Sequence, residues 1–203
     1  MKRLNRLFYE RDTRVVAKEL LGKVLVHEIN GERVSGKIVE TEAYLGVEDK
    51  AAHSYGGKRT PRVEVMYGKA AVSYVFIIYG MYYCFNIVTR EEGVPQAVLI
   101  RALEPLEGLD TISKNRFKKR YDELTKVQTK NLSNGPGKLC NALSINKSLN
   151  NLDVINSNLY VEEGENLGFE IVASKRIGID YAEEYRDFLW RYYIKNNRNV
   201  SVL

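Results

Sequence analysis

The chain has 203 residues, of which 44% are hydrophobic and 28% charged, and 31 Lys and Arg against 26 Asp and Glu give a net charge of +5. This composition excludes an intrinsically disordered chain and allows one domain with a substantial core. Two cysteines, Cys84 and Cys140, and two histidines, His27 and His53, are too few and too scattered for a disulfide framework or a structural zinc site. No apolar segment typical of a secretory signal follows the basic start of the sequence, so we expect a reducing compartment.

The first part of the chain is predicted to form a short helix and a hairpin. Asp12 can cap a helix that runs to about Leu21. Two strands, 23–29 and 32–44, follow it. They are joined by Asn30-Gly31, the residue pair that most favours a tight hairpin turn.

The stretch 46–66 is predicted to be a surface loop, and its length makes it a candidate functional segment. The next twenty residues after Lys69 carry no charge, which is long enough for a membrane-spanning helix. Tyrosines, a glycine and an asparagine interrupt this run, so a hairpin of strands 72–78 and 81–89 with its bend at Tyr79-Gly80 is the better interpretation. Because the run is apolar on both faces, we expect the hairpin to be central in a sheet. A membrane-associated protein built on this run stays open as an alternative.

The second half of the chain is predicted to alternate strands and helices. A buried strand covers 97–103, and Glu104-Pro105 is expected to open a helix. Another helix is expected to begin near Pro136. The remaining elements are strands at 159–161, 170–173 and 190–194 and a helical segment at 180–188. No repeat or composition break divides the chain, so we expect one mixed α/β domain over residues 1–203.

A basic window from Thr111 to Lys130 carries the whole net charge. It holds two acids and seven basic residues, and 24 basic and 24 acidic residues balance elsewhere. A solvated helix and loop would explain the window as well as a nucleic-acid surface would. If the partner is a nucleic acid, neutralising Lys118, Lys119 and Arg120 should flatten the salt dependence of binding and leave base choice intact.

Polar side chains stand out on three predicted strands. Because alternate residues of a strand share a face, Glu40, Glu42 and Tyr44 should lie together, with Val39 and Ala43 behind them. A solvent-exposed face would explain these acids without any function.

Asn86 and Arg101 lie in strongly apolar strand sequences, where an unpaired polar group is costly. We expect Arg101 to pair with Glu40 or Glu42 and to hold that carboxylate ionised, as a general base requires. A buried ion pair that only fixes the strand register is an equally good interpretation.

Aromatic residues could bind a planar ring. Tyr79, at the bend of the second hairpin and followed by Met81, resembles the apolar wedges that proteins insert between stacked bases. Tyr44, His53 and Phe76 could sandwich a planar heterocycle. Each of these residues could equally be an ordinary core or turn aromatic.

Several longer motifs occur in order along the chain. They are Val39 to Gly46 (VETEAYLG), Ala51 to Ser54 (AAHS), Thr60 to Arg62 (TPR), Ile78 to Tyr82 (IYGMY), Leu99 to Pro105 (LIRALEP), Gly135 to Cys140 (GPGKLC) and Ile145 to Lys147 (INK). On these motifs the sequence resembles the alkyladenine (3-methyladenine) DNA glycosylase family, from about Arg14 to Val202. The resemblance implies a mixed α+β fold, a single domain with a curved, largely antiparallel sheet, a protruding β-hairpin and surrounding helices.

The family resemblance also implies an activity. Such enzymes flip a damaged purine (3-methyladenine, 7-methylguanine or hypoxanthine) out of duplex DNA and hydrolyse its N-glycosidic bond. By analogy Glu42 is the base that activates water, and Arg101 and the backbone carbonyl of Ile177 hold that water. No lysine matches a catalytic position, so we expect no Schiff base and no strand cleavage. We also expect no cofactor and no metal. The expected partner is double-stranded DNA containing damaged purines. We expect the protein to be a monomer that does not bind membranes. Its expected location is the cytoplasm, near the nucleoid, of a bacterium or archaeon, or the nucleus of a eukaryote.

The remaining roles follow from the same resemblance. Tyr44, His53 and Phe76 match the walls of the base pocket, and a tyrosine is usual in some members at the position of Phe76. Asn86 matches the side chain that disfavours the 2-amino group of guanine. The residues matched to stack filling are Tyr79 and Met81, and those matched to the DNA backbone are Lys58, Arg59, Thr60 and Lys138. A non-catalytic nucleic-acid-binding module that uses the same aromatics for stacking is the alternative.

Overall fold

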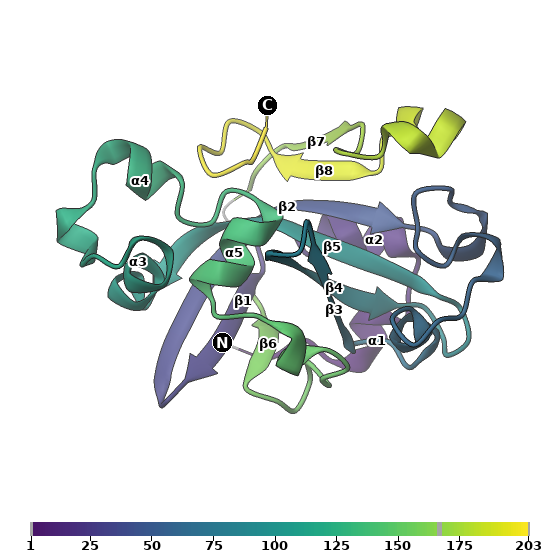
Figure 1. Cartoon of the computed structure of the whole chain (residues 1–203), viewed down its shortest axis with the longest axis horizontal. Helices are drawn as coiled ribbons and strands as arrows, with labels where there is room; N and C mark the ends of the chain where they lie inside the picture. The colour runs from purple at the N-terminus through teal and green to yellow at the C-terminus, as the bar shows by residue number, and fades with distance from the viewer. Residues whose placement is uncertain (1, 166–167, 203) are drawn as a thin grey trace.

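A curved antiparallel sheet forms the centre of the molecule (Figure 1). The computed structural model describes residues 2–165 and 168–202. The main strand order is β3-β4-β5-β2-β1-β6, and β8 pairs with both β2 and β7. The strands are β1 (Val24–Ile29), β2 (Glu32–Tyr44), β3 (Ser73–Ile78), β4 (Tyr82–Thr89), β5 (Gln96–Glu107), β6 (Leu159–Glu162), β7 (Ile171–Ser174) and β8 (Arg191–Ile194). The helices are α1 (Arg6–Tyr9), α2 (Thr13–Glu19), α3 (Leu109–Phe117), α4 (Lys126–Lys130) and α5 (Pro136–Ala142). The predicted fold class, a single mixed α/β domain with a curved antiparallel sheet, is confirmed.

The helices cover both faces of this sheet. Figure 1 shows α5 in front of the sheet and α1 and α2 behind it. Asp12 caps α2 as predicted, because its carboxylate accepts the backbone N–H of Arg14 at 2.9 Å. The hydroxyl of Thr41 on β2 donates to the carbonyl of Ala17 on α2 at 2.8 Å, which fixes the rear face of this strand. Glu40, with the alternate residues after it on β2, therefore lies on the front face.

Two tight hairpin turns have the same backbone shape but different sequences. Asn30 and Gly31, between β1 and β2, have φ angles of 51° and 84°. Tyr79 and Gly80, between β3 and β4, have φ angles of 50° and 69°. Asparagine tolerates this left-handed conformation, whereas a bulky tyrosine is strained in it. Local strain of this kind at an exposed tip is typical of a functional position.

The prediction that a helix begins at Glu104-Pro105 is wrong. β5 continues through both residues, and α3 starts only at Leu109. A proline is tolerated in this strand because β4 pairs with β5 only as far as Leu99, and because the ladder with β2 shifts register at Gly36, opposite Pro105.

The prediction that both strands of the second hairpin are central in the sheet is wrong for β3. β3 and β4 form as predicted, but β3 is the edge strand of the sheet. It is apolar on both faces because Val75 packs into the main core while Tyr74 and Phe76 line a cavity on the front. Within residues 2–165 and 168–202, every helix is too short or too polar to span a bilayer.

Two segments differ from their expected local structure. The stretch 46–66 is not a plain surface loop, because it includes short 3₁₀ helices and buries Asp49 and Met66. The helical segment expected at 180–188 is a 3₁₀ helix, η6 (Asp180–Asp187), rather than an α-helix. Both segments supply residues to the same cavity.

Candidate active site

Two rows of side chains cross the front of the sheet and place the candidate site. In the first row, Tyr74 on β3 is opposite Asn86 on β4, which is opposite Leu99 on β5, which is opposite Glu42 on β2. Two residues further along each strand, the second row brings Phe76, Cys84 and Arg101 together beside Glu40. Directly opposite residues share a face of a sheet, so this register puts the polar groups together.

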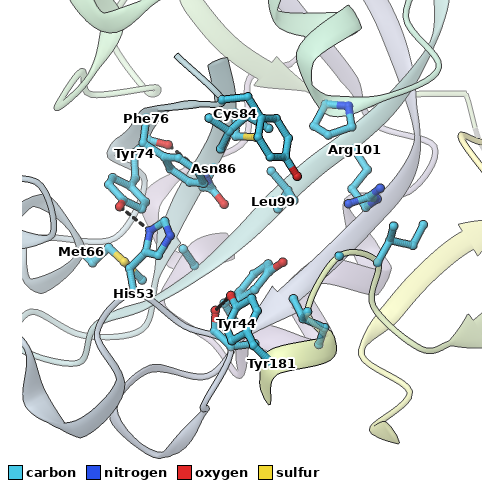
Figure 2. A pocket seen from close by; sticks show the side chains of 18 residues that line it. Tyr44, His53, Met66, Tyr74, Phe76, Cys84, Asn86, Leu99, Arg101 and Tyr181 are labelled. Carbon is cyan, nitrogen blue, oxygen red and sulfur yellow. Dashed lines mark hydrogen bonds between the residues drawn. The ribbon is translucent and has the colours of Figure 1, made fainter. Parts of the chain in front are cut away.

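A cavity of about 330 Å³ lies over these rows, at the lower end of the roughly 300–1,000 Å³ usual for small-molecule sites. Figure 2 shows His53, Tyr74 and Phe76 on one side of it and Tyr44 on another. Its lining includes seven of the residues singled out from the sequence. They are Tyr44, His53, Phe76, Tyr79, Asn86, Arg101 and Ile177. The cavity can therefore hold a planar ring between aromatic side chains.

Glu42 lies just behind the wall of this cavity and is fully buried. Its Oε1 accepts the backbone N–H of Ile177 at 2.8 Å and lies 3.3 Å from Nη1 of Arg101. Its Oε2 accepts the hydroxyl of Tyr44 at 2.8 Å. These three partners suit an ionised carboxylate, and all three line the cavity. Burial and the charge of Glu42 raise the pKa of Tyr44 well above its ordinary value, so this hydroxyl stays protonated and donates.

Glu40 connects the candidate site to the C-terminal segment. Arg101 Nε donates to its Oε1 at 3.0 Å, which confirms the expected pairing of Arg101 with a strand carboxylate. Arg191 Nε on β8 donates to the same oxygen at 2.7 Å. Ser201 donates its backbone N–H to Oε2 at 2.7 Å and its hydroxyl to Oε1 at 2.9 Å. Glu40 is fully buried, so it balances two buried arginines.

A second buried ion pair, which no sequence pattern predicts, joins two segments that line the cavity. Arg176 donates from both terminal nitrogens to Asp49, at 2.6 and 2.8 Å, and also to the carbonyl of Ala43 at 3.0 Å. Its guanidinium lies 4.8 Å from the centre of the Tyr44 ring. Because Arg176 directly precedes Ile177, this pair fixes both the aromatic wall and the N–H that reaches Glu42.

His53 is held as a neutral ring in the opposite wall. Its Nδ1 lies 2.7 Å from the hydroxyl of Tyr74, and its ring packs edge-on against Phe76 with centroids 4.6 Å apart. Burial, and then the positive charge of Arg62, lower the pKa of His53 from 6.5 to about 4. Arg62 lies over the ring of Phe76, 4.9 Å from its centroid. Asn86, between these walls, donates its side-chain amide to the backbone carbonyl of Tyr74 at 3.0 Å.

Other residues predicted to contact DNA are exposed, on the hairpin tip or in the stretch 58–60. Tyr79 is 87% exposed at the hairpin tip, and Met81 is 66% exposed beside it. Lys58, Arg59 and Thr60 form an exposed stretch that is separate from the cavity lining.

Lys138 is different from these exposed residues, because it lies on α5 and is half-buried. Its Nζ donates to side-chain oxygens of Asn131 and Asn134. The described residues contain no cluster of three or more His, Cys, Asp or Glu side chains that could hold a metal ion.

Comparison with known proteins assigns the chain to a family. The sequence model of the methylpurine-DNA glycosylase family matches residues 7–198, and the chain belongs to that family. It is 66% identical, over 202 residues and 100% of both chains, to a protein of Desulfitobacterium hafniense (strain Y51) named as a candidate 3-methyladenine DNA glycosylase. Proteins with the same name from Clostridium acetobutylicum and Clostridium novyi are 62% and 59% identical, over 99% of this chain and 98% and 99% of their own lengths.

Proposed function

We propose that this protein is a monofunctional DNA glycosylase that removes alkylated or deaminated purines from duplex DNA, with Glu42 as the base that activates water. The observation that supports this most directly is the carboxylate of Glu42, fixed by Arg101, Tyr44 and Ile177 at the wall of an aromatic cavity. The names of the bacterial relatives agree with the proposal. We further propose that the protein is a monomer and that it acts on the nucleoid in the bacterial cytoplasm.

The chemistry suits these residues. Hydrolysis of an N-glycosidic bond passes through a state with positive charge on the sugar, which an ionised Glu42 would stabilise while it takes a proton from water. An alkylated purine is already cationic and departs without a strong acid. Neutral aromatic rings and a neutral His53 would hold the flipped base, and weak pairing makes a damaged base cheaper to flip.

Water must reach a carboxylate that is fully buried in this structure. A carboxylate offers about four acceptor positions, and three groups on the cavity wall cover Glu42. One acceptor position therefore remains, and we propose that the water reaches it from the cavity, which Arg101, Tyr44 and Ile177 line.

The test is base release by wild type and by Glu42→Gln, which keeps the shape of the side chain and removes its charge. Duplexes carry 3-methyladenine, 7-methylguanine or hypoxanthine, and released bases are quantified. We expect release by wild type only. Glu48→Gln is the matched control, because Glu48 is exposed on a neighbouring 3₁₀ helix, and it should behave as wild type. Equal release by wild type and Glu42→Gln, or no release by wild type, contradicts the proposal.

A non-catalytic nucleic-acid-binding module is the second candidate, and the complete burial of Glu42 favours it. In that case wild type and Glu42→Gln would bind lesion-containing duplexes equally and release nothing. Tyr79→Ala separates the two further: a glycosylase should lose its preference for damaged sites and keep general DNA binding, whereas a stacking module should lose both.

A further inference from the structure

The basic window of the sequence is not one continuous surface. Lys126 and Lys130 lie on α4 and line a groove. Arg120, which precedes α4, is already paired with Asp122 at 2.8 Å. The α4 lysines are therefore better placed to bind an external anion than Arg120 is.

The groove lies between α4 and the segment that follows β8, and its volume is about 1260 Å³. Figure 1 shows α4 and the end of the chain on the same side of the molecule. One wall carries Lys126 and Lys130, the other carries Arg198, and Lys138 lies between them. None of the described residues that line it is acidic, and the remaining polar groups are amides and hydroxyls. The groove therefore offers positive charge and hydrogen-bond donors together.

Two half-buried cations have no carboxylate partner among the described residues. Lys138 lines the groove, whereas Arg116 lies outside its lining and contacts the lining residue Asn131. Lys138 uses two of its three N–H donors on Asn131 and Asn134, at 2.7 and 2.9 Å, which leaves one for another acceptor. Arg116 reaches the carbonyl of Asn131 at 3.2 Å, but its buried Nε has no partner. Burial and the nearby Arg116 lower the pKa of Lys138. Burying a cation without a counter-ion is costly, and an anion bound in the groove would offset that cost.

The same short segment separates this groove from the cavity. Pro136, the first residue of α5, lines the cavity, while Asn134 and Lys138 on either side of it line the groove. A nucleic-acid strand with one nucleotide in the cavity would thus have its backbone next to the groove. We propose that the groove binds the phosphodiester backbone of the same DNA duplex, outside the damaged nucleotide. This inference rests on the proposed function for its choice of polyanion.

The test compares salt dependence of binding to an undamaged duplex, which needs no catalytic activity. Each phosphate contact contributes about −0.9 to the slope of log K against log salt. We expect the double variant Lys126→Gln/Lys130→Gln to reduce the slope by about 1.8 and Arg198→Gln, on the opposite wall, by about 0.9. The control Lys2→Gln/Lys18→Gln removes two exposed charges distant from the groove, one of them on α2 behind the sheet, and should leave the slope unchanged.

The outcomes separate a groove from a merely basic helix. If the α4 variant reduces the slope but Arg198→Gln does not, the two walls do not act together and the inference is overturned. It is also overturned if the control lowers the slope equally. Single-turnover base release at saturating DNA should be unchanged in the groove variants, and a loss there would place these residues in the cavity chemistry instead. Wild type that binds duplex with the expected slopes but releases no base would refute the proposed function and leave the groove standing.

Discussion

The hairpin tip gives a prediction in which stability and function change in opposite directions. Tyr79 has a φ of 50°, a conformation that costs an ordinary residue roughly 1–2 kcal/mol. Asn30 has a φ of 51° at the corresponding position of the other hairpin, and asparagine adopts this conformation with little strain. Because Tyr79 is 87% exposed, replacing it sacrifices little packing. Tyr79→Asn should therefore stabilise the fold by about 1 kcal/mol.

In a chain of this size, about 1 kcal/mol corresponds to a rise in Tm of roughly 2–4 °C, which differential scanning calorimetry resolves. The reciprocal variant Asn30→Tyr introduces the same strain at the exposed β1–β2 turn and should lower Tm by a similar amount. Binding to lesion-containing duplex should weaken in Tyr79→Asn, because the aromatic wedge is gone, and stay unchanged in Asn30→Tyr. A lower Tm for Tyr79→Asn, or no change for Asn30→Tyr, would show that the turn is not strained.

Two further predictions concern buried groups. Glu40→Gln leaves Arg101 and Arg191 without their shared negative charge and should destabilise the protein by about 3–5 kcal/mol. The measurement is the midpoint of urea unfolding, which should fall. An unchanged midpoint would show that the two arginines do not depend on the charge of Glu40. The pKa of His53 falls from 6.5 to about 4, so its neutral form is favoured by folding; this contribution is complete above pH 6.5 and is lost as pH falls toward 4. Arg62→Gln should raise that pKa, as followed by the imidazole NMR signals, and an unshifted titration would exclude Arg62 as a cause.

Much of the site could be predicted because its residues belong to strong local patterns. Glu40, Glu42 and Tyr44 alternate on one strand, and a buried Arg101 needs a carboxylate partner, so that pairing followed from burial alone. Arg191 could not be assigned to Glu40 in this way. It joins the site only because β8 pairs with the far side of β2, and the order of strands in a sheet is a property of the whole chain.

The ion pair of Asp49 and Arg176 was missed for a related reason. The two residues are separated by more than half the chain and lie outside regular strands, so no periodicity links them. The error at Pro105 has a different origin, because a proline before a helical pattern favours a helix start. The missing β4 partner and the register shift at Gly36, which make an extended proline acceptable, are visible only in the fold.

The wall of the cavity also contains the thiol of Cys84, and the burial of this thiol affects how readily alkylating agents would react with the protein. Burial raises the pKa of Cys84 to about 11, and burial likewise raises the pKa of Cys140 well above its ordinary value. These are the two cysteines of the chain, and thiolates rather than thiols react with electrophiles. A cell that accumulates methylated purines contains the reagents that methylate them. With both thiols buried and protonated, the protein presents little thiolate to the alkylating agents that create the substrate proposed for it.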